Sequence, residues 1–340
     1  MYSDAELDAA VGDGAISAEA AASLRAHVAR QRATPAADEE QFRLLTGFND
    51  IFVSIAATLM LVALAWLTGS ISPPVSAAAV AVASWGLAEF FTRRRRMALP
   101  SIILLASFAG CCYFLGLVLA KTMLAIGGPR PGGDTIGIAS GAIAAVAGTW
   151  FHWRRFRVPI TVAVGAVAGV GAVVAALVAL IPGLGESWLA LVFISGIALF
   201  ALAMRWDMSD RLRTTRRSDV AFWLHLSAAP LIVHPVFALL GLLGAGADIG
   251  RAAAAFGLYL VLAAVALVVD RRALLVSALS YVLYAISTLV QAAGAVSVNF
   301  SLTTLVVGSG LLLLSAFWPT ARRLVLGLVP HGLRARVPVA

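Results

Sequence analysis

Long apolar runs separated by short polar turns dominate the pattern of this sequence. From about residue 51 to residue 319, each run holds roughly 18 or more predominantly apolar residues. A helix of that length crosses a hydrocarbon core of about 30 Å at about 1.5 Å per residue. The sequence predicts ten such helices, at 51–69, 73–92, 98–120, 135–153, 158–181, 187–205, 220–244, 251–269, 273–294 and 299–319.

The apolar residues are continuous within each run, whereas the strands of a membrane barrel would alternate apolar and polar positions. A single helix also satisfies its own backbone hydrogen bonds in lipid. Composition points the same way, because 61% of the 340 residues are hydrophobic and only 12% are charged, against about 25% charged in ordinary soluble domains. The sequence therefore predicts an all-α, polytopic membrane protein of about ten transmembrane helices.

The net charge of +8 is unevenly distributed. Residues 1–47 contain eight acidic and four basic residues, a net of −4, so the remainder carries +12. Of the 21 basic residues after position 47, all but Lys121, Arg130 and Arg251 fall in turns on one side of the predicted membrane. Basic turns mark the cytoplasmic side, so we expect both termini to be cytoplasmic. The charge gives no support for a nucleic-acid partner.

The N-terminal residues have a different character. Residues 1–33 favour a helical hairpin outside the membrane, with Ser17 as an N-cap, and residues 34–47 resemble a linker. The transmembrane domain follows at 48–328 and a basic tail at 329–340. The segment "RRLVLGLVPHGLRAR" at 322–336 is basic and amphipathic enough to lie along the inner leaflet. The hairpin is too small for a core of its own. We therefore expect it to contact a protein partner or a second copy, or to serve as a solvated leader.

Arginine clusters recur at intervals of about 60 residues, at Arg93–Arg96, Arg154–Arg157, Arg205–Arg217 and Arg271–Arg272. Each lies between an incoming and an outgoing helix, so repeated two-helix units could arise by duplication, or only because positive-inside turns between equal helices look alike. With "GAISAEAA" at Gly14–Ala21, the chain resembles bacterial multi-spanning inner-membrane proteins of unknown function that carry a G-x-I-S/T-x-E-x-A hairpin before eight to ten spans. The resemblance implies the architecture and a bacterial cytoplasmic membrane, and it implies no activity.

The seventh run contains the most unusual polar groups, in "DVAFWLHLSAAPLIVHP" from Asp219 to Pro235. At about 100° per residue, His225 and His234 face opposite sides of an unbroken helix. The two prolines favour a kink that frees backbone carbonyls. Asp219 and His234 share a face, which gives a polar stripe of Asp219, Trp223, Ser227, Pro230 and His234.

Ionisable residues at membrane depth are candidates for function, so the stripe is a candidate polar cavity or translocation path. His234 and His225 could equally be satisfied by single hydrogen bonds to neighbouring helices, and Asp219 could cap its helix beside arginine. Glu89 lies one turn before Arg93 near the cytoplasmic interface. There it could belong to the same path or form an ordinary i,i+4 ion pair.

No enzyme signature is present: the sequence has no H-E-x-x-H, no G-x-S-G, no P-loop and no paired intramembrane aspartates. No two mid-membrane histidines lie on different helices, which argues against b-type haem, and we expect neither cofactor nor metal. Our functional expectation is non-enzymatic transport or permeation of a small solute or ion. The alternative is a membrane scaffold or envelope accessory protein that binds partners through residues 1–33.

Overall fold

A computed structural model describes residues 4–33, 48–126, 128, 132–181, 183–210, 215–241, 249–292 and 299–330. The described residues form helices and connecting turns, with no strand among them. They divide into two compact units, residues 1–42 and 43–340. The all-α fold predicted from the sequence is confirmed.

The N-terminal unit consists of two helices, α1 (Asp4–Gly12) and α2 (Ala18–Ala33). Ser17 caps α2, because its Oγ accepts a hydrogen bond of 3.1 Å from the amide of Ala20. An ion pair of 2.7 Å between Arg25 and Asp8 joins the two helices. The predicted linker, residues 34–47, lies outside the described residues.

The larger unit contains a helix for each of the ten apolar runs. They are α3 (Phe48–Gly69), α4 (Pro73–Ala88) with the π-helix η1 (Glu89–Arg94), α5 (Ala98–Ile126), α6 (Gly133–Phe156), α7 (Pro159–Leu180), α8 (Trp188–Met208) preceded by the 3-10 turn η2 (Leu184–Ser187), α9 (Arg216–Leu239), α10 (Ile249–Val269), α11 (Ala273–Ala292), α12 (Asn299–Ala316) and α13 (Trp318–Leu328). Among the described residues, eight helices are long and apolar enough to cross a membrane. The bent pair α12–α13 would make a ninth.

The tenth run differs from its prediction. It was expected to continue to residue 319, but α12 ends at Ala316 and α13 leaves it at an angle of 78°. Pro319 stands in the first turn of α13, where its missing N–H and fixed φ favour the start of a new helix over continuation of the old one. Of the predicted basic tail at 329–340, only the first two residues are described.

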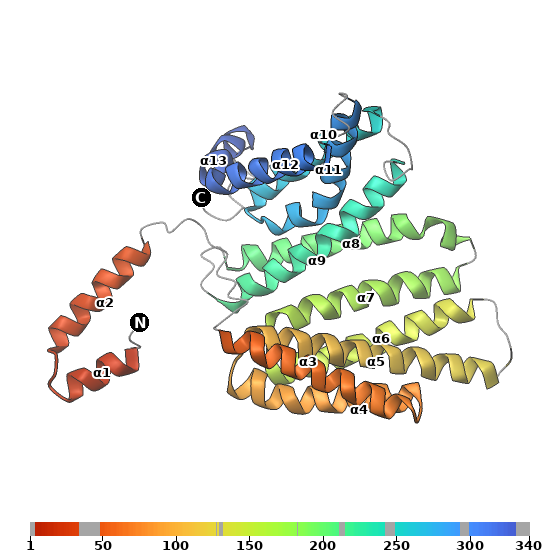
Figure 1. The fold of residues 1–340 in the computed structure, drawn as a ribbon, viewed down its shortest axis with the longest axis horizontal. Coiled ribbons are helices and arrows are strands. Elements are labelled where there is room, and N and C mark those ends of the chain that lie inside the picture. The colour runs from red at the N-terminus through yellow and green to blue at the C-terminus, as the bar shows by residue number, and fades with distance from the viewer. Residues whose placement is uncertain are drawn as a thin grey trace. The chain divides into compact units, whose positions relative to one another are not determined.

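Consecutive helices from α3 to α7 pack side by side, and α8 pairs with α9, as Figure 1 shows. Helix α9 is the central one, since it also contacts α7 and α11. Half of the residues in its most apolar stretch are buried, the largest share among the eight candidate spans. The turns η1–α5, α6–α7 and α8–α9 lie at one end of the unit (Figure 1). Because these turns carry the arginine clusters, we call this end the basic end.

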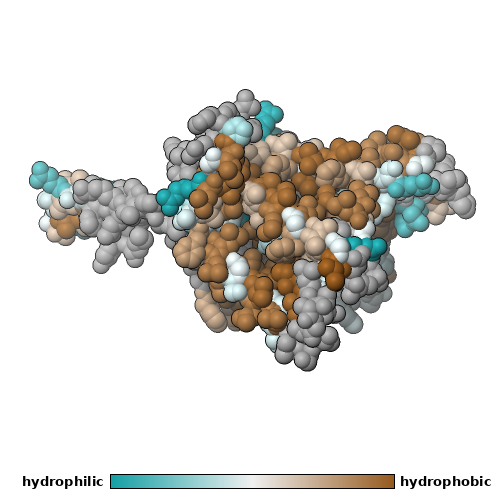
Figure 2. All heavy atoms as spheres, turned by 90° about the horizontal axis from the view of Figure 1, so that it is seen from above, coloured by the Kyte–Doolittle hydropathy of each residue, from teal (hydrophilic) through white to brown (hydrophobic). Residues whose placement is uncertain are grey.

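Large apolar side chains cover much of the outer surface, as the face in Figure 2 shows. On α3, for example, Phe52, Leu59 and Trp66 are all exposed. A soluble monomer rarely leaves such extensive apolar surface open to water, whereas hydrocarbon solvates it. The chain is therefore a membrane protein with transmembrane helices.

Glycines allow close approach between several helices, as the small-residue spacing predicts. A Cβ atom added to Gly141 of α6 would lie 2.7 Å from the carbonyl oxygen of Tyr113 in α5. One added to Gly165 of α7 would lie 2.8 Å from Oγ1 of Thr149 in α6. These two glycines therefore let α5, α6 and α7 approach closely.

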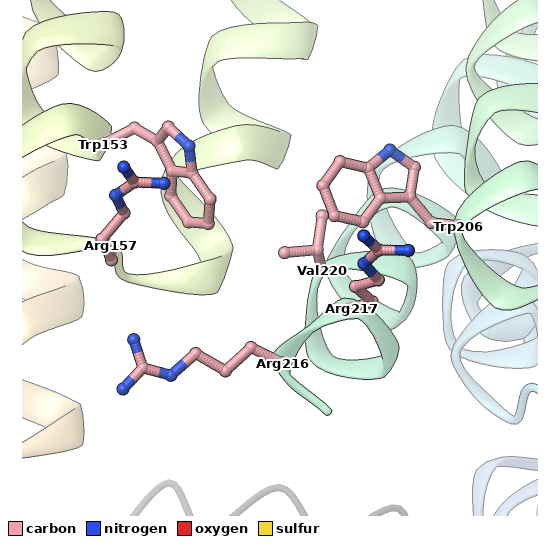
Figure 3. Close-up of a pocket in the computed structure, with 6 residues that line it drawn as sticks. All are labelled: Trp153, Arg157, Trp206, Arg216, Arg217 and Val220. Atoms are coloured by element: carbon pink, nitrogen blue, oxygen red, sulfur yellow. The ribbon is translucent and has the colours of Figure 1, made fainter. Parts of the chain in front are cut away.

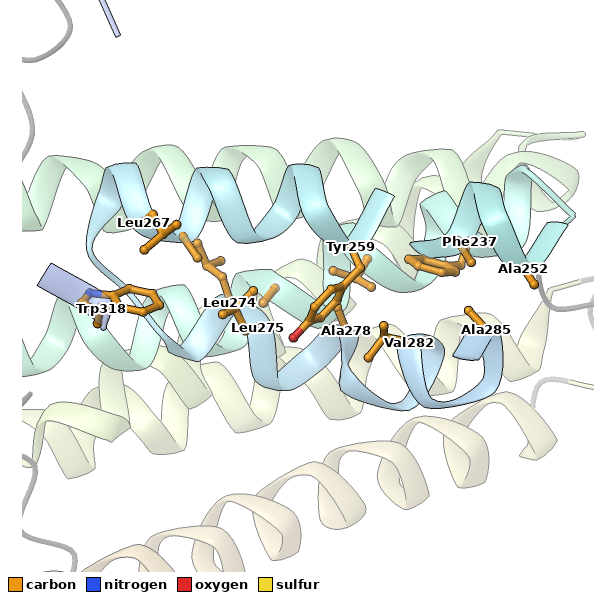
Figure 4. Close-up of a cluster of buried hydrophobic side chains, with 14 residues drawn as sticks. Phe237, Ala252, Tyr259, Leu267, Leu274, Leu275, Ala278, Val282, Ala285 and Trp318 are labelled. Atoms are coloured by element: carbon orange, nitrogen blue, oxygen red, sulfur yellow. The ribbon is translucent and has the colours of Figure 1, made fainter. Parts of the chain in front are cut away.

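A buried apolar cluster unites α9, α10, α11 and α13 (Figure 4). Phe237 comes from α9, Tyr259 and Leu267 from α10, Val282 from α11 and Trp318 from α13. The cluster holds α13 on the other helices despite its sharp departure from α12. Leu267 and Leu274 of this cluster lie close in the chain to the charged residues of the α10–α11 turn described next.

Candidate functional site

Three ionisable side chains meet inside the protein near the basic end. Asp207 lies in the last turn of α8, His225 in α9, and Arg271 between α10 and α11. The side chains of Asp207, His225 and Arg271 are 1%, 0% and 2% exposed. We call these three residues the buried charge cluster.

Asp207 is the centre of this cluster. His225 Nε2 lies 2.9 Å from its Oδ2, and because an ionised carboxylate only accepts, Nε2 is the nitrogen that donates. Arg271 donates from Nε to Oδ2 at 3.2 Å and from Nη2 to Oδ1. The guanidinium also reaches the carbonyl oxygen of Ser218 at 3.4 Å. Two donors thus balance one buried carboxylate, and α8, α9 and the α10–α11 turn are tied together.

Capping contacts connect the end of α8 to the start of α9, beside the cluster. Oδ2 of Asp210 accepts hydrogen bonds from the amide and hydroxyl of Thr215, at 2.9 and 2.6 Å. The Thr215 hydroxyl in turn accepts one from the amide of Arg217 at 3.2 Å and caps α9. The start of α9 is therefore anchored to the end of α8, at a set distance from Asp207.

A second charged contact borders the cluster. Asp270, next to Arg271, has a left-handed backbone with φ of 60° and accepts a hydrogen bond of 2.8 Å from Trp318 Nε1. Arg322 lies 3.6 Å from the same carboxylate, and Arg272 stacks 5.1 Å above the Trp318 ring. These contacts dock α13 beside the α10–α11 turn.

The predicted polar stripe lies on the less buried side of α9. Asp219, Trp223 and Ser227 are partly exposed and His234 is exposed, whereas His225 on the opposite side is fully buried. Nδ1 of His234 lies 2.8 Å from the hydroxyl of Tyr281 in α11. The two histidines therefore contact different helices and do not share a site, as their half-turn separation predicts.

The prolines do not interrupt the seventh helix, which runs continuously from Arg216 to Leu239 with Pro230 and Pro235 inside it. Pro235 has no N–H to offer the carbonyl of Leu231. Gly196 of α8 packs against this carbonyl, since an added Cβ would lie 2.9 Å from its oxygen. A neighbouring backbone thus covers the carbonyl that the sequence predicted to be freed.

Glu89 forms the i,i+4 ion pair with Arg93 at 3.3 Å and a closer bidentate contact with Arg155, at 2.6 and 2.9 Å. Arg155 comes from the end of α6, so Glu89 joins two helix ends. All three side chains are partly exposed, and such pairs add little stability. Among the described residues, the charged partners of Glu89 are Arg93 and Arg155, and neither belongs to the buried charge cluster.

His152 of α6 occupies a closed aromatic environment formed by Trp85, Phe108 and Phe156, with ring centroids 6.1, 6.0 and 4.6 Å away. Its Nδ1 lies 3.1 Å from Oγ1 of Thr161 in α7. Its Nε2 has no hydrogen-bond partner among the described residues. The ring is 1% exposed, so it serves the packing of α4 to α7.

A cavity of about 420 Å³ opens where α6, α8 and α9 meet at the basic end (Figure 3). Trp153 and Arg157 extend from the α6 side, and Trp206 from α8. Its remaining lining residues belong to the first turns of α9, namely Arg216, Arg217 and Val220. We call it the basic cavity.

Sequence reasoning identified His225 but missed its partners, and it counted Arg157, Arg216, Arg217 and Arg271 only as turn charges. A signal was available, because Asp207 ends an otherwise apolar run in "RWDMSD" and a buried carboxylate needs a cation. Which arginine supplies it depends on helix packing that no local pattern encodes. Comparison with protein-family models, with curated proteins and with solved structures yields no match.

Proposed function

We propose that this chain is a transport or permeation protein for a small solute or ion, and that the buried charge cluster is its proton- or charge-sensitive element. The observation that carries the proposal is the hydrogen bond between His225 and Asp207 at 0% and 1% exposure, with Arg271 on the same carboxylate. Buried ionisable groups in membrane proteins mark substrate or proton pathways by default.

The chemistry of the cluster supports this role. With Asp207 ionised, Arg271 charged and His225 neutral, the three groups sum to zero, and a proton on His225 leaves one positive charge in a buried position. Such an uncompensated charge changes the strength of the contacts that join α8, α9 and the α10–α11 turn through Asp207. An imidazole can take up or release a proton at its ring nitrogens, so His225 is the group of the three best suited to respond to a proton gradient.

The stripe on α9 remains a candidate path of its own, on the side of the helix opposite the buried charge cluster. His234 and Tyr281 form a second polar contact about 13 Å further along the axis of α9, from nine residues at about 1.5 Å each. Asp219, Trp223 and Ser227 lie on the same side of that helix. A solute that follows this side would pass from the basic end to His234.

The test uses purified protein in vesicles that contain a pH-sensitive dye, challenged with an inward proton gradient and a panel of small solutes. We expect a proton flux that Asp207→Asn or His225→Ala abolishes, whereas the matched control Asp13→Asn, on an exposed turn of the N-terminal unit, leaves it intact. Equal flux in all variants and in protein-free vesicles would contradict the proposal.

The scaffold alternative draws on one observation, the separation of residues 1–42 as a compact unit. It makes the opposite prediction in a parallel experiment. Deletion of residues 1–33 would then abolish co-purification of a partner, and Asp207→Asn would leave the physiology of the cell unchanged once expression is matched.

A further inference from the structure

We propose that the basic cavity binds a phosphate group, supplied either by the headgroup of an anionic phospholipid or by a soluble phosphate compound. This site is distinct in its residues from the buried charge cluster, and the inference does not depend on the transport proposal. At about 420 Å³ the cavity falls in the size range of small-molecule sites.

The cavity gathers three guanidinium groups from two separate places in the chain. Arg157 follows α6, whereas Arg216 and Arg217 begin α9. Guanidinium groups bind phosphate oxygens through two parallel N–H donors, which makes arginine better suited than lysine to this ligand. Figure 3 shows Trp153 and Arg157 on one side of the space and Trp206, Arg217 and Val220 on the other, with Arg216 reaching from the start of α9 back towards the Arg157 side.

The structure shows no ion pair for these three arginines among the described residues. Within the described residues no carboxylate lies within 4 Å of Arg157, Arg216 or Arg217, although other arginines of the basic end do have such partners. Asp219, one turn into α9, has a favourable electrostatic interaction with Arg216 and offsets one charge. A positive excess therefore remains in the cavity.

The start of α9 does not itself supply the attraction for an anion. The 24-residue helix α9 begins at Arg216, but Thr215 already caps this helix end and the carboxylate of Asp210 binds Thr215 there, so the attraction for an anion rests on the arginine side chains. Arg157 is held by a left-handed backbone with φ of 56°, and its guanidinium stacks 5.7 Å from the Trp153 ring. The stacking orients one wall of the cavity before any ligand arrives.

Two tryptophans suit this position to a membrane surface. Trp153 and Trp206 are partly buried residues at the basic ends of α6 and α8, and tryptophan rings favour the level of the lipid headgroups. Cytoplasmic leaflets carry anionic lipids, and basic pockets between transmembrane helices bind their headgroups. The same chemistry would also accept a soluble phosphate that enters from the cytoplasm.

The first experiment measures lipid retention by native mass spectrometry of protein in detergent with a mixture of phosphatidylglycerol and phosphatidylcholine. We compare the wild type with Arg157→Gln/Arg216→Gln/Arg217→Gln. The matched control, Arg94→Gln/Arg154→Gln/Arg323→Gln, removes three exposed arginines outside the cavity. The cavity variant should lose about 10- to 100-fold in affinity for phosphatidylglycerol, because it removes the bidentate donors to the phosphate. The control removes only diffuse surface charge and should lose less than about threefold.

A second arm uses inorganic phosphate and protein in pure phosphatidylcholine nanodiscs, with melting temperature as the readout. Selective phosphatidylglycerol retention alone identifies the lipid headgroup as the source, and a melting shift with phosphate that the cavity variant loses identifies a soluble phosphate. Either result supports the phosphate site. An Arg→Lys version of the cavity variant should recover only part of the binding, because lysine lacks the bidentate geometry.

The proposal is overturned if the cavity variant and the control lose lipid affinity equally and neither responds to phosphate, because the arginines would then act only as a diffuse surface charge. A cavity variant that fails to fold is recognised by its melting temperature in the absence of ligand. In that case single Arg157→Gln and Arg217→Gln variants are compared with Arg94→Gln, and equal affinities in all three would overturn the proposal.

Discussion

The effect of Arg271 on stability depends on the buried position of its charged side chain. Its side chain is 2% exposed and forms two hydrogen bonds to Asp207. A buried ion pair is not necessarily more stabilising than apolar residues would be, but removing one partner leaves an uncompensated charge in a medium of low dielectric constant. A substitution that removes only one partner of this pair is therefore the costly one for stability.

We expect Arg271→Gln to lower the free energy of unfolding by about 3–5 kcal/mol, because the carboxylate of Asp207 would remain buried with His225 alone. The double variant Arg271→Gln/Asp207→Asn should recover a substantial part of this loss, since no net charge is then buried. Unfolding in mixed detergent micelles measures both. Additive losses from the two substitutions would show that the residues do not interact.

Trp318 makes a similar contribution through its indole N–H. Trp318→Phe keeps an aromatic ring but removes the donor of the 2.8 Å bond to Asp270, which should cost about 1–3 kcal/mol. Because that bond helps to dock α13, trypsin should cleave after the exposed Arg323 faster in the variant. Trp66→Phe, at an exposed position of α3, is the control and should leave the cleavage rate unchanged.

At the scale of elements, the contact between α8 and α9 depends on the absence of a side chain at Gly196. The backbone of Leu231, whose carbonyl lacks its helical donor because of Pro235, occupies the space that a Cβ would need. A small residue on one helix and a proline on the other thus meet at one point. The glycine therefore gives the Leu231 carbonyl, which Pro235 leaves without a helical donor, room against α8.

Gly196→Ala should destabilise the protein by about 1–3 kcal/mol, because a methyl group 2.9 Å from the Leu231 carbonyl forces α8 and α9 apart. Gly257→Ala in α10 is a matched control, since a Cβ there meets nothing within 4 Å. It should be neutral or stabilising by up to about 1 kcal/mol. Thermal melting of the two variants in the same detergent tests the difference, and equal melting temperatures would contradict the proposed contact.

At the scale of the whole molecule, the sequence predicts helices better than it predicts their contacts. Apolar runs define where helices can lie in a bilayer, so each predicted run contains an observed helix. The break at Phe317 escaped prediction because apolar residues continue through it. The site was only partly predictable. His225 is conspicuous in an apolar helix, but its pairing with Asp207, 18 positions away, and the pairing of Asp207 with Arg271, 64 positions away, follow from packing.

The orientation of the bundle is the remaining whole-molecule prediction. Contacts between turns support a common basic end, since Glu89 binds Arg155 and Arg271 binds Asp207. The positive-inside rule then predicts that this end faces the cytoplasm. In a background of Cys111→Ala/Cys112→Ala, Ser70→Cys in the α3–α4 turn and Glu186→Cys in η2 should react with a membrane-impermeant maleimide in intact cells. Ser209→Cys, after α8, should react only after permeabilisation. All three positions are exposed, so differences in labelling report sidedness, and the reverse pattern would show that the basic end faces outward.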